Sequence, residues 1–386
     1  MKSDIGNFYD FITDFFQNQP RELSYLNDSW SDLDKWKVTA REKVLDSLSH
    51  FPPRTHLQPK TISSKENENH IQEEVEFNTS ALTRVSGTVL KPKTGKKVYP
   101  AIVALHDHGG FYYFGREKII SSSSEPDVLK EFKKLYYGNR SWANELVQRG
   151  YIVLVIDAFY FGKRKLDYSA VSDEIKERFK NPLEELSEGS NEYIEAFNMM
   201  CRQYEGLLVR HIFTAGSTWA GILSHDDRLS VEYLLSRDDV DSTRIGCSGL
   251  SIGGYRAALL AGTDPRISCA VITGWMPSLQ SLLHSRLRDH TFMVFIPGLL
   301  GRHMEFSDIV SIMAPNPLFV QQCRLDDLYT ETGMRDACDS LEKVYIKADR
   351  PNNFKSKFYE CTHKFNVEMQ DDALDWLDQH LQLGEL

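Results

Sequence analysis

Residues 244–262 read RIGCSGLSIGGYRAALLAG, and this stretch decides how the rest of the chain is interpreted. Within it, the pentapeptide GLSIG (249–253) falls where an apolar strand pattern stops and a helical pattern begins. That setting is typical of a serine held out on a sharp strand-to-helix turn. Glycines two positions before and after Ser251 allow such a turn to close, because they carry no Cβ atom. We predict that Ser251 is a nucleophile, the alternative being a glycine-rich loop without chemistry.

The residues next to Ser251 refine this prediction. A helix that starts after Ser251 presents free backbone N–H groups at its first turn, where a developing oxyanion is stabilised. The amide of Ile252 is the first such donor. Ser248 lies three residues earlier, at the end of the strand, and has no glycine two positions after it. We therefore interpret Ser248 as structural.

Two later segments supply partners for a nucleophilic serine. PLFVQQCRLDDLYT (317–330) places Asp326 and Asp327 just past a buried strand, and FYECTHKF (358–365) places His363 between the last strand and the last helix. A serine needs a base, and the base needs a group that orients it. The order serine, acid, histidine matches that of strand-to-helix nucleophiles. We predict His363 as the base and Asp326 as the acid, with Asp327 as the alternative.

The strand and helix patterns define the fold class. YPAIVALHDHGG (99–110) and GYIVLVIDAF (150–159) are continuously apolar, which is typical of parallel strands buried on both faces. IQEEVEF and TRVSGTVLKP alternate like antiparallel edge strands. Strands alternate with helical patterns from there to the end, so we predict an α/β fold with a mostly parallel central sheet flanked by helices.

The predicted organisation has two parts. Residues 1–80 form a helical amino-terminal cap that packs on a catalytic domain of residues 81–386. Within that domain, residues 165–212 are polar, rich in glutamate and helical in pattern, so they are interpreted as an inserted lid. The aromatic segment FYDFITDFF (8–16) fits packing on its own domain or on a second subunit equally well, so a homo-oligomer is one open outcome.

Composition excludes several classes of protein. The chain is 41% hydrophobic with a formal net charge of −10, and no stripe of lysine and arginine alternates with aromatics. We expect no nucleic-acid partner. No apolar run approaches the roughly 18 residues of a membrane span, and the start lacks a signal-peptide pattern, so we expect no membrane partner and a cytoplasmic protein. The six cysteines contain no CxxC pair, so reduced thiols are expected.

The segment LHDHGG (105–110) ends the first buried strand. In this architecture the second oxyanion donor comes from such a loop, and the amide of His108 is the predicted donor. Gly109 and Gly110 let the backbone turn toward the nucleophile. His106 and His108 have no accompanying carboxylate or cysteine cluster, so we predict no metal and no cofactor.

From about residue 80 onward the sequence resembles the α/β-hydrolase superfamily, and within it the dienelactone-hydrolase-like and acetyl-xylan-esterase-like carboxylesterases. The stretches that carry this resemblance are YPAIVALHDHGG, GYIVLVIDAFYFGKR, DVDSTRIGCSGLSIGGYRAALLAG, APNPLFVQQCRLDDLYT and THKF. The resemblance implies hydrolysis of a carboxylic ester, with Ser251, Asp326 and His363 as the triad and the amides of Ile252 and His108 as the oxyanion hole. Asp107 and Cys323 stand where the family usually has glycine.

The expected substrate is a small-molecule, short-chain ester, with an acetylated carbohydrate as first choice and a lactone or aryl ester as alternatives. Large apolar side chains near the predicted site are candidates for binding it, namely Phe111, Tyr112, Trp275 and Met276. Two other functions stay open: a serine peptidase of the same fold, and a binding protein without catalysis. The complete set of Ser251, Asp326 and His363 argues against the second.

Overall fold

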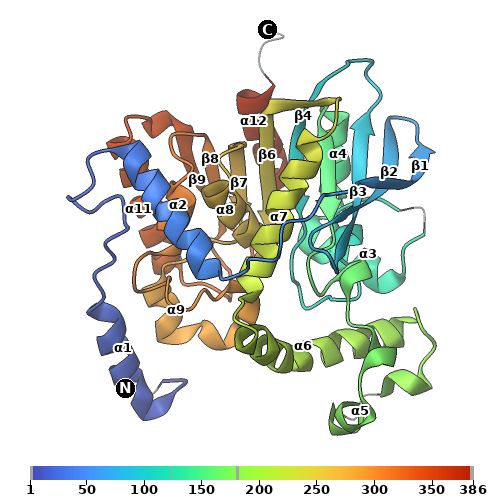
Figure 1. Cartoon of the computed structure of the whole chain (residues 1–386), viewed down its shortest axis with the longest axis horizontal. Helices are drawn as coiled ribbons and strands as arrows, with labels where there is room; N and C mark the ends of the chain where they lie inside the picture. The colour runs from blue at the N-terminus through green and yellow to red at the C-terminus, as the bar shows by residue number, and fades with distance from the viewer. Residues whose placement is uncertain (1–2, 123, 180–181, 383–386) are drawn as a thin grey trace.

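The computed structural model describes residues 3–122, 124–179 and 182–382. Within these residues, nine strands form one mixed sheet in the order β1-β2-β3-β5-β4-β6-β7-β8-β9 (Figure 1). Strands β5, β4, β6, β7, β8 and β9 are parallel, whereas β1, β2 and β3 pair antiparallel at one side. The predicted mixed sheet with a parallel interior is confirmed. The strands are β1 (Lys60–Glu66), β2 (His70–Asn78), β3 (Arg84–Pro92), β4 (Tyr99–Leu105), β5 (Ile152–Ile156), β6 (Val240–Leu250), β7 (Ile267–Thr273), β8 (Leu318–Cys323) and β9 (Phe354–Tyr359).

Helices cover both faces of the sheet. On one face lie α2 (Leu33–Leu48), α7 (Trp219–Leu235), α8 (Ile252–Thr263), α10 (Phe306–Ser311) and α11 (Glu331–Lys347). On the other lie α3 (Asp127–Tyr137), α4 (Trp142–Gln148) and α12 (Val367–Leu381). Because side chains alternate along a strand, Val103 of β4 packs into the first layer and Ile102 into the second. All seven residues of β4 are buried, which explains its unbroken apolar sequence.

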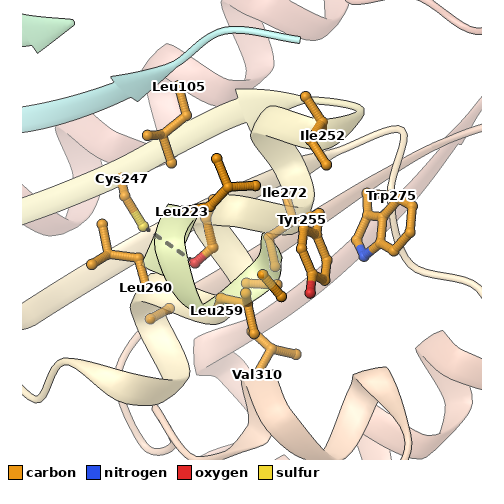
Figure 2. Packing of buried hydrophobic residues seen from close by; sticks show 14 of the residues in the cluster. Leu105, Leu223, Cys247, Ile252, Tyr255, Leu259, Leu260, Ile272, Trp275 and Val310 are labelled. Carbon is orange, nitrogen blue, oxygen red and sulfur yellow. Dashed lines mark hydrogen bonds between the residues drawn. The ribbon is translucent and has the colours of Figure 1, made fainter. Parts of the chain in front are cut away.

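Helix α8 is packed on every side. All twelve of its residues are buried. Figure 2 shows Tyr255 and Leu259 of α8 among Leu223 of α7, Ile272 of β7 and Val310 of α10. An element enclosed in this way has little room to move, so the turn that precedes α8 is held on a rigid base.

The amino-terminal segment differs from its predicted extent. The helices α1 (Tyr9–Gln17) and α2 are present, and α2 packs against α7 and α8. However, residues 60–78 already form β1, a tight turn and β2 of the central sheet. The expectation of a helical cap reaching residue 80 is therefore wrong, because its last part belongs to the sheet.

The two edges of the sheet are β1 and β9. Every residue of β1 is exposed, and its side chains include Lys60 and Lys65. In β9, Lys355 and Ser356 are exposed. The edge strand β1 lies outside the apolar clusters, whereas β9 contributes Tyr359 to one cluster and packs Phe354 and Phe358 against the other.

The inserted segment between β5 and β6 lies along one side of the molecule, where it crosses the ends of the strands rather than following the sheet's edge strands β1 and β9. It contains α5 (Asp173–Phe179) and the long helix α6 (Asn191–Thr214), and Figure 1 shows α6 running along the lower edge of the molecule. That edge is the one at which β6 ends and α8 begins. The short helix α9 (Leu279–Ser285) also lies toward this edge.

Five of the six cysteines are buried, and all six are free thiols. Across the described parts of the chain, no helix is both long and apolar enough to cross a bilayer.

A buried ion pair joins α7 to α8. Arg256 Nε donates to Asp227 Oδ2 at 2.9 Å and Nη2 donates to Oδ1 at 2.6 Å, with both side chains 1% exposed. Asp227→Leu strands the guanidinium in the core, so we expect the free energy of unfolding to fall by about 3–5 kcal/mol, measured by urea denaturation. Asp227→Leu combined with Arg256→Met should recover most of that loss. A loss for Asp227→Leu no larger than for Arg335→Met, which breaks a surface pair with Glu331, would contradict this.

Candidate active site

Ser251 is the single residue between the end of β6 and the start of α8. Its backbone has φ 59° and ψ −121°, a conformation that costs energy for a residue with a Cβ atom. Its N–H donates to the carbonyl of Thr273 at 2.9 Å, which fixes the turn against β7. The predicted sharp turn at Ser251 is present.

The glycines around Ser251 are required by close backbone contacts. A Cβ atom on Gly249 would lie 2.5 Å from the backbone of Gly253 and of Leu105. A Cβ atom on Gly253 would lie 2.2 Å from the carbonyl oxygen of Leu105. The turn therefore closes onto the end of β4, and the loop after β4 is brought beside Ser251.

Asp326 and His363 meet at the ends of β8 and β9. His363 Nδ1 lies 2.6 Å from Asp326 Oδ2, and the Asp326 side chain is fully buried. The second carboxylate oxygen, Oδ1, accepts from the N–H of Leu328 at 2.8 Å. Asp327 is exposed to solvent. Of the two aspartates considered from the sequence, Asp326 is thus the one that contacts His363.

One cavity joins these residues. It has a volume of about 360 Å³, and both Ser251 and His363 line it. Ile252 and His108, the predicted oxyanion donors, line the same cavity. Residues from three separate segments therefore converge where the parallel strands end, which is where open α/β sheets bind ligands.

The four predicted substrate-binding side chains divide into two pairs. Tyr112 and Trp275 line the cavity. Phe111 lies outside that lining and stacks on Phe132, with ring centroids 4.8 Å apart. Met276 is fully buried in the core. The expectation that Phe111 and Met276 face the substrate is therefore not met, because both side chains turn inward to fill the layers beneath the loop.

Ile252 is the first residue of α8, so its N–H has no acceptor within the helix. This amide directly follows the nucleophile candidate. The position is the one from which the positive end of a helix stabilises a negative oxygen.

The loop after β4 is built on a neutral histidine. His106 Nε2 accepts from the N–H of Ala158 at 3.1 Å, so Nδ1 carries the proton and donates to the carbonyl of Asp107 at 2.8 Å. Burial, together with the charges of Lys118 and Arg256, holds the pKa of His106 well below its ordinary value. His106 is therefore neutral, and both of its ring nitrogens form fixed hydrogen bonds that hold the loop.

A buried glutamate from α6 also reaches this loop. Glu205 Oε1 accepts from His108 Nε2 at 2.9 Å and from the hydroxyl of Tyr112 at 2.8 Å, while Oε2 accepts from Thr291 at 2.8 Å. Burial opposes ionisation of Glu205, but these hydrogen bonds outweigh it and hold the pKa below its ordinary value. Glu205 also lines the cavity, so α6 contributes a wall of it.

Glu205 and Thr291 were not identified from the sequence. Glu205 is one of many acidic residues in a polar helical segment, and only its neighbours in space distinguish it. Among the described residues, no group of three or more His, Cys, Asp or Glu side chains is arranged to hold a metal ion.

Comparison with known protein-family models finds no match. The sequence is similar to "Putative hydrolase YtaP" of Bacillus subtilis (strain 168), with 25% identity over 282 residues, which cover 73% of this chain and 78% of that protein. Among solved structures, a "putative acetyl xylan esterase" from Bacteroides fragilis superposes with a TM-score of 0.67 at 19% identity, over 93% of this chain and 85% of that one.

A glucuronoyl esterase from Solibacter usitatus superposes with a TM-score of 0.62 at 12% identity, over 95% of this chain and 98% of that one. The methylesterase BT1017 gives 0.60 at 16% identity, over 98% of this chain and 68% of that one. The chain thus has the fold of these esterases, and the expected α/β-hydrolase fold is confirmed.

Proposed function

We propose that this protein is a serine carboxylesterase. The observation that carries the proposal is the strained Ser251 turn, which opens on the same cavity as the imidazole of His363, itself paired with buried Asp326. An inert glycine-rich loop has no need of a strained non-glycine residue. The fold shared with solved esterases and the similarity to a named hydrolase support the same chemistry.

The proposed reaction has two acyl-transfer steps. His363 Nε2 takes the hydroxyl proton of Ser251 while Oγ attacks the ester carbonyl carbon, and Asp326 holds the proton on Nδ1. The carbonyl oxygen becomes an oxyanion, which accepts from the amides of Ile252 and His108. When the tetrahedral intermediate collapses, the alcohol leaves with the proton from His363. Water then repeats the sequence on the acyl-enzyme and releases the acid.

The proposed substrate is a short-chain ester of a carbohydrate. The cavity is modest in volume, and it combines aromatic walls from Tyr112 and Trp275 with hydrogen-bonding groups from Glu205, Thr291 and Arg202. Sugars need both kinds of contact, because their rings have apolar faces and hydroxyl rims. Relatives in fold are named for acetyl xylan and glucuronoyl esters, which supports an ester on a sugar.

The test combines turnover with covalent labelling. Purified protein should hydrolyse p-nitrophenyl acetate faster than the butyrate and much faster than the octanoate, and should leave acetyl p-nitroanilide nearly intact. An alkyl fluorophosphonate should modify it once, and peptide mass analysis should place the adduct on Ser251. Labelling elsewhere, or no hydrolysis of any ester, would contradict the proposal; faster turnover of the anilide would favour a peptidase.

A further inference from the structure

Lys118 is a fully buried lysine under the loop after β4. It ends the short helical turn η2 (Arg116–Lys118), and its side chain has no exposed surface. Its Nζ donates to the carbonyl of Asp107 at 2.8 Å and to the carbonyl of His108 at 2.9 Å. The ammonium also lies over the ring of Phe161, 4.8 Å from its centroid. Lysine side chains are rarely buried to this degree. The carbonyls of Asp107 and His108 replace the water that the Lys118 ammonium would otherwise contact.

The contact with Asp107 determines where the amide of His108 points. In a trans peptide the C=O and the following N–H lie on opposite edges of one plane. The carbonyl of Asp107 accepts from Lys118 on one side of the loop and also from His106 Nδ1. The N–H of His108 is therefore directed away from the lysine.

The loop needs such anchoring because the two residues that follow His108 are both glycines. Gly109 and Gly110 both adopt positive φ, 54° and 66°. Glycine has access to many other conformations, so these two residues do not themselves fix the peptide before them. The carbonyl of His108 is held by Lys118 and by the N–H of Phe111 at 3.0 Å, which restrains the loop from its second peptide as well.

We propose that Lys118 is a positioning residue that sets the oxyanion hole by fixing and polarising the peptide between Asp107 and His108. This inference rests on the proposed esterase function. A hydrogen bond to the carbonyl of a peptide strengthens its N–H as a donor, and a positive donor does so most. The stronger hydrogen bond from the His108 N–H lowers the free energy of the transition state, because negative charge develops on the substrate oxygen there.

The charges around Lys118 come from several elements. Asp107 Oδ2 lies 4.0 Å from Nζ, and the carboxylates of Glu117 and Asp157 also favour the charged lysine. Arg256 disfavours it, and the neutral His106 and the rings of Phe132 and Phe161 also lie near the ammonium.

Burial is the largest of these effects and lowers the pKa of Lys118 to about 8. The ammonium therefore loses its proton as the pH rises through about 8, and kcat should decline over the same range.

The experiment compares three variants with p-nitrophenyl acetate as substrate. Lys118→Met should lower kcat about 10²-fold with KM changed less than about threefold, since an oxyanion donor acts in the transition state. Lys118→Arg keeps the charge and the donors, so it should retain more activity and lose the decline near pH 8. Lys133→Met is the matched control, because Lys133 is also buried and donates to a carbonyl, that of Ile120 at 2.7 Å, away from the cavity.

Each outcome decides the matter. If Lys118→Met keeps kcat within about threefold of the wild type, Lys118 has only a packing role and the inference is wrong. The same conclusion follows if Lys133→Met lowers kcat as much as Lys118→Met does while both variants lower Tm equally. Should Lys118→Met fail to fold, the pH profile of Lys118→Arg decides: an unchanged decline near pH 8 overturns the inference. A wild-type protein without esterase activity overturns the proposed function, and the inference with it.

Discussion

Ser251→Ala is expected to lower kcat for p-nitrophenyl acetate by about 10⁶-fold, the scale seen when a triad serine is removed from a hydrolase. Without Oγ no acyl-enzyme forms, and only the oxyanion donors and substrate binding remain to assist attack by water. The fold should be retained, because alanine is tolerated wherever serine already adopts the strained turn. Single-turnover and steady-state kinetics measure the change, and thermal unfolding checks the fold.

Ser248→Ala is the control for this experiment. Ser248 lies three residues earlier on β6, is buried, and its hydroxyl has no partner among the described residues. Loss of the Ser248 hydroxyl should leave kcat within about threefold of the wild-type value. Equal activity of Ser251→Ala and wild type would show that the turn is not catalytic.

Asp326→Asn is expected to lower kcat by about 10⁴-fold, the effect of the same change in a well-studied triad. The oxygen of the new side-chain amide would keep the hydrogen bond from Leu328 N–H, which leaves the amide nitrogen facing His363. An amide nitrogen donates, so His363 Nδ1 would have to accept and its proton would move to Nε2. In that tautomer Nε2 cannot take the proton of Ser251. Steady-state kinetics measure the loss, and an unchanged kcat would contradict the role given to Asp326.

Asp327→Asn separates the two aspartates. Asp327 is exposed and its neighbour makes the contact with His363, so activity should stay within about threefold. A large loss with Asp327→Asn and a small one with Asp326→Asn would reverse the assignment of the acid.

The sequence predicted the structure best where a local pattern, such as the glycines around Ser251, agreed with the order of serine, acid and histidine along the chain. The apolar runs of β4 and β5 predicted buried strands, because a strand enclosed on both faces has no polar side to show. The glycines around Ser251 predicted the turn, because the backbone contacts at Gly249 and Gly253 leave no space for a Cβ atom. The pairing of Asp326 with His363 followed from their places after consecutive strands of the sheet.

Other features left no trace in the local sequence. The strand β1 has seven exposed residues and is held by backbone pairing with β2, so it lacks the alternation that marks a strand. The inward turn of Phe111 and Met276 is set by tertiary packing, whereas composition reveals only that both are large and apolar. The burial of Lys118 and Glu205 is also set by packing, since charged residues are by default read as solvent-exposed.

The two charged edges of the sheet bear on how copies of this protein meet one another. An open edge exposes unpaired N–H and C=O groups, which can template a strand from another chain and start aggregation. Here Lys60 and Lys65 stand on β1, and Lys355 and Lys357 on β9. Pairing another strand with either edge would remove water from the ammonium groups of Lys60, Lys65 or Lys355, which disfavours that pairing. These lysines therefore disfavour growth of the sheet by edge-to-edge pairing.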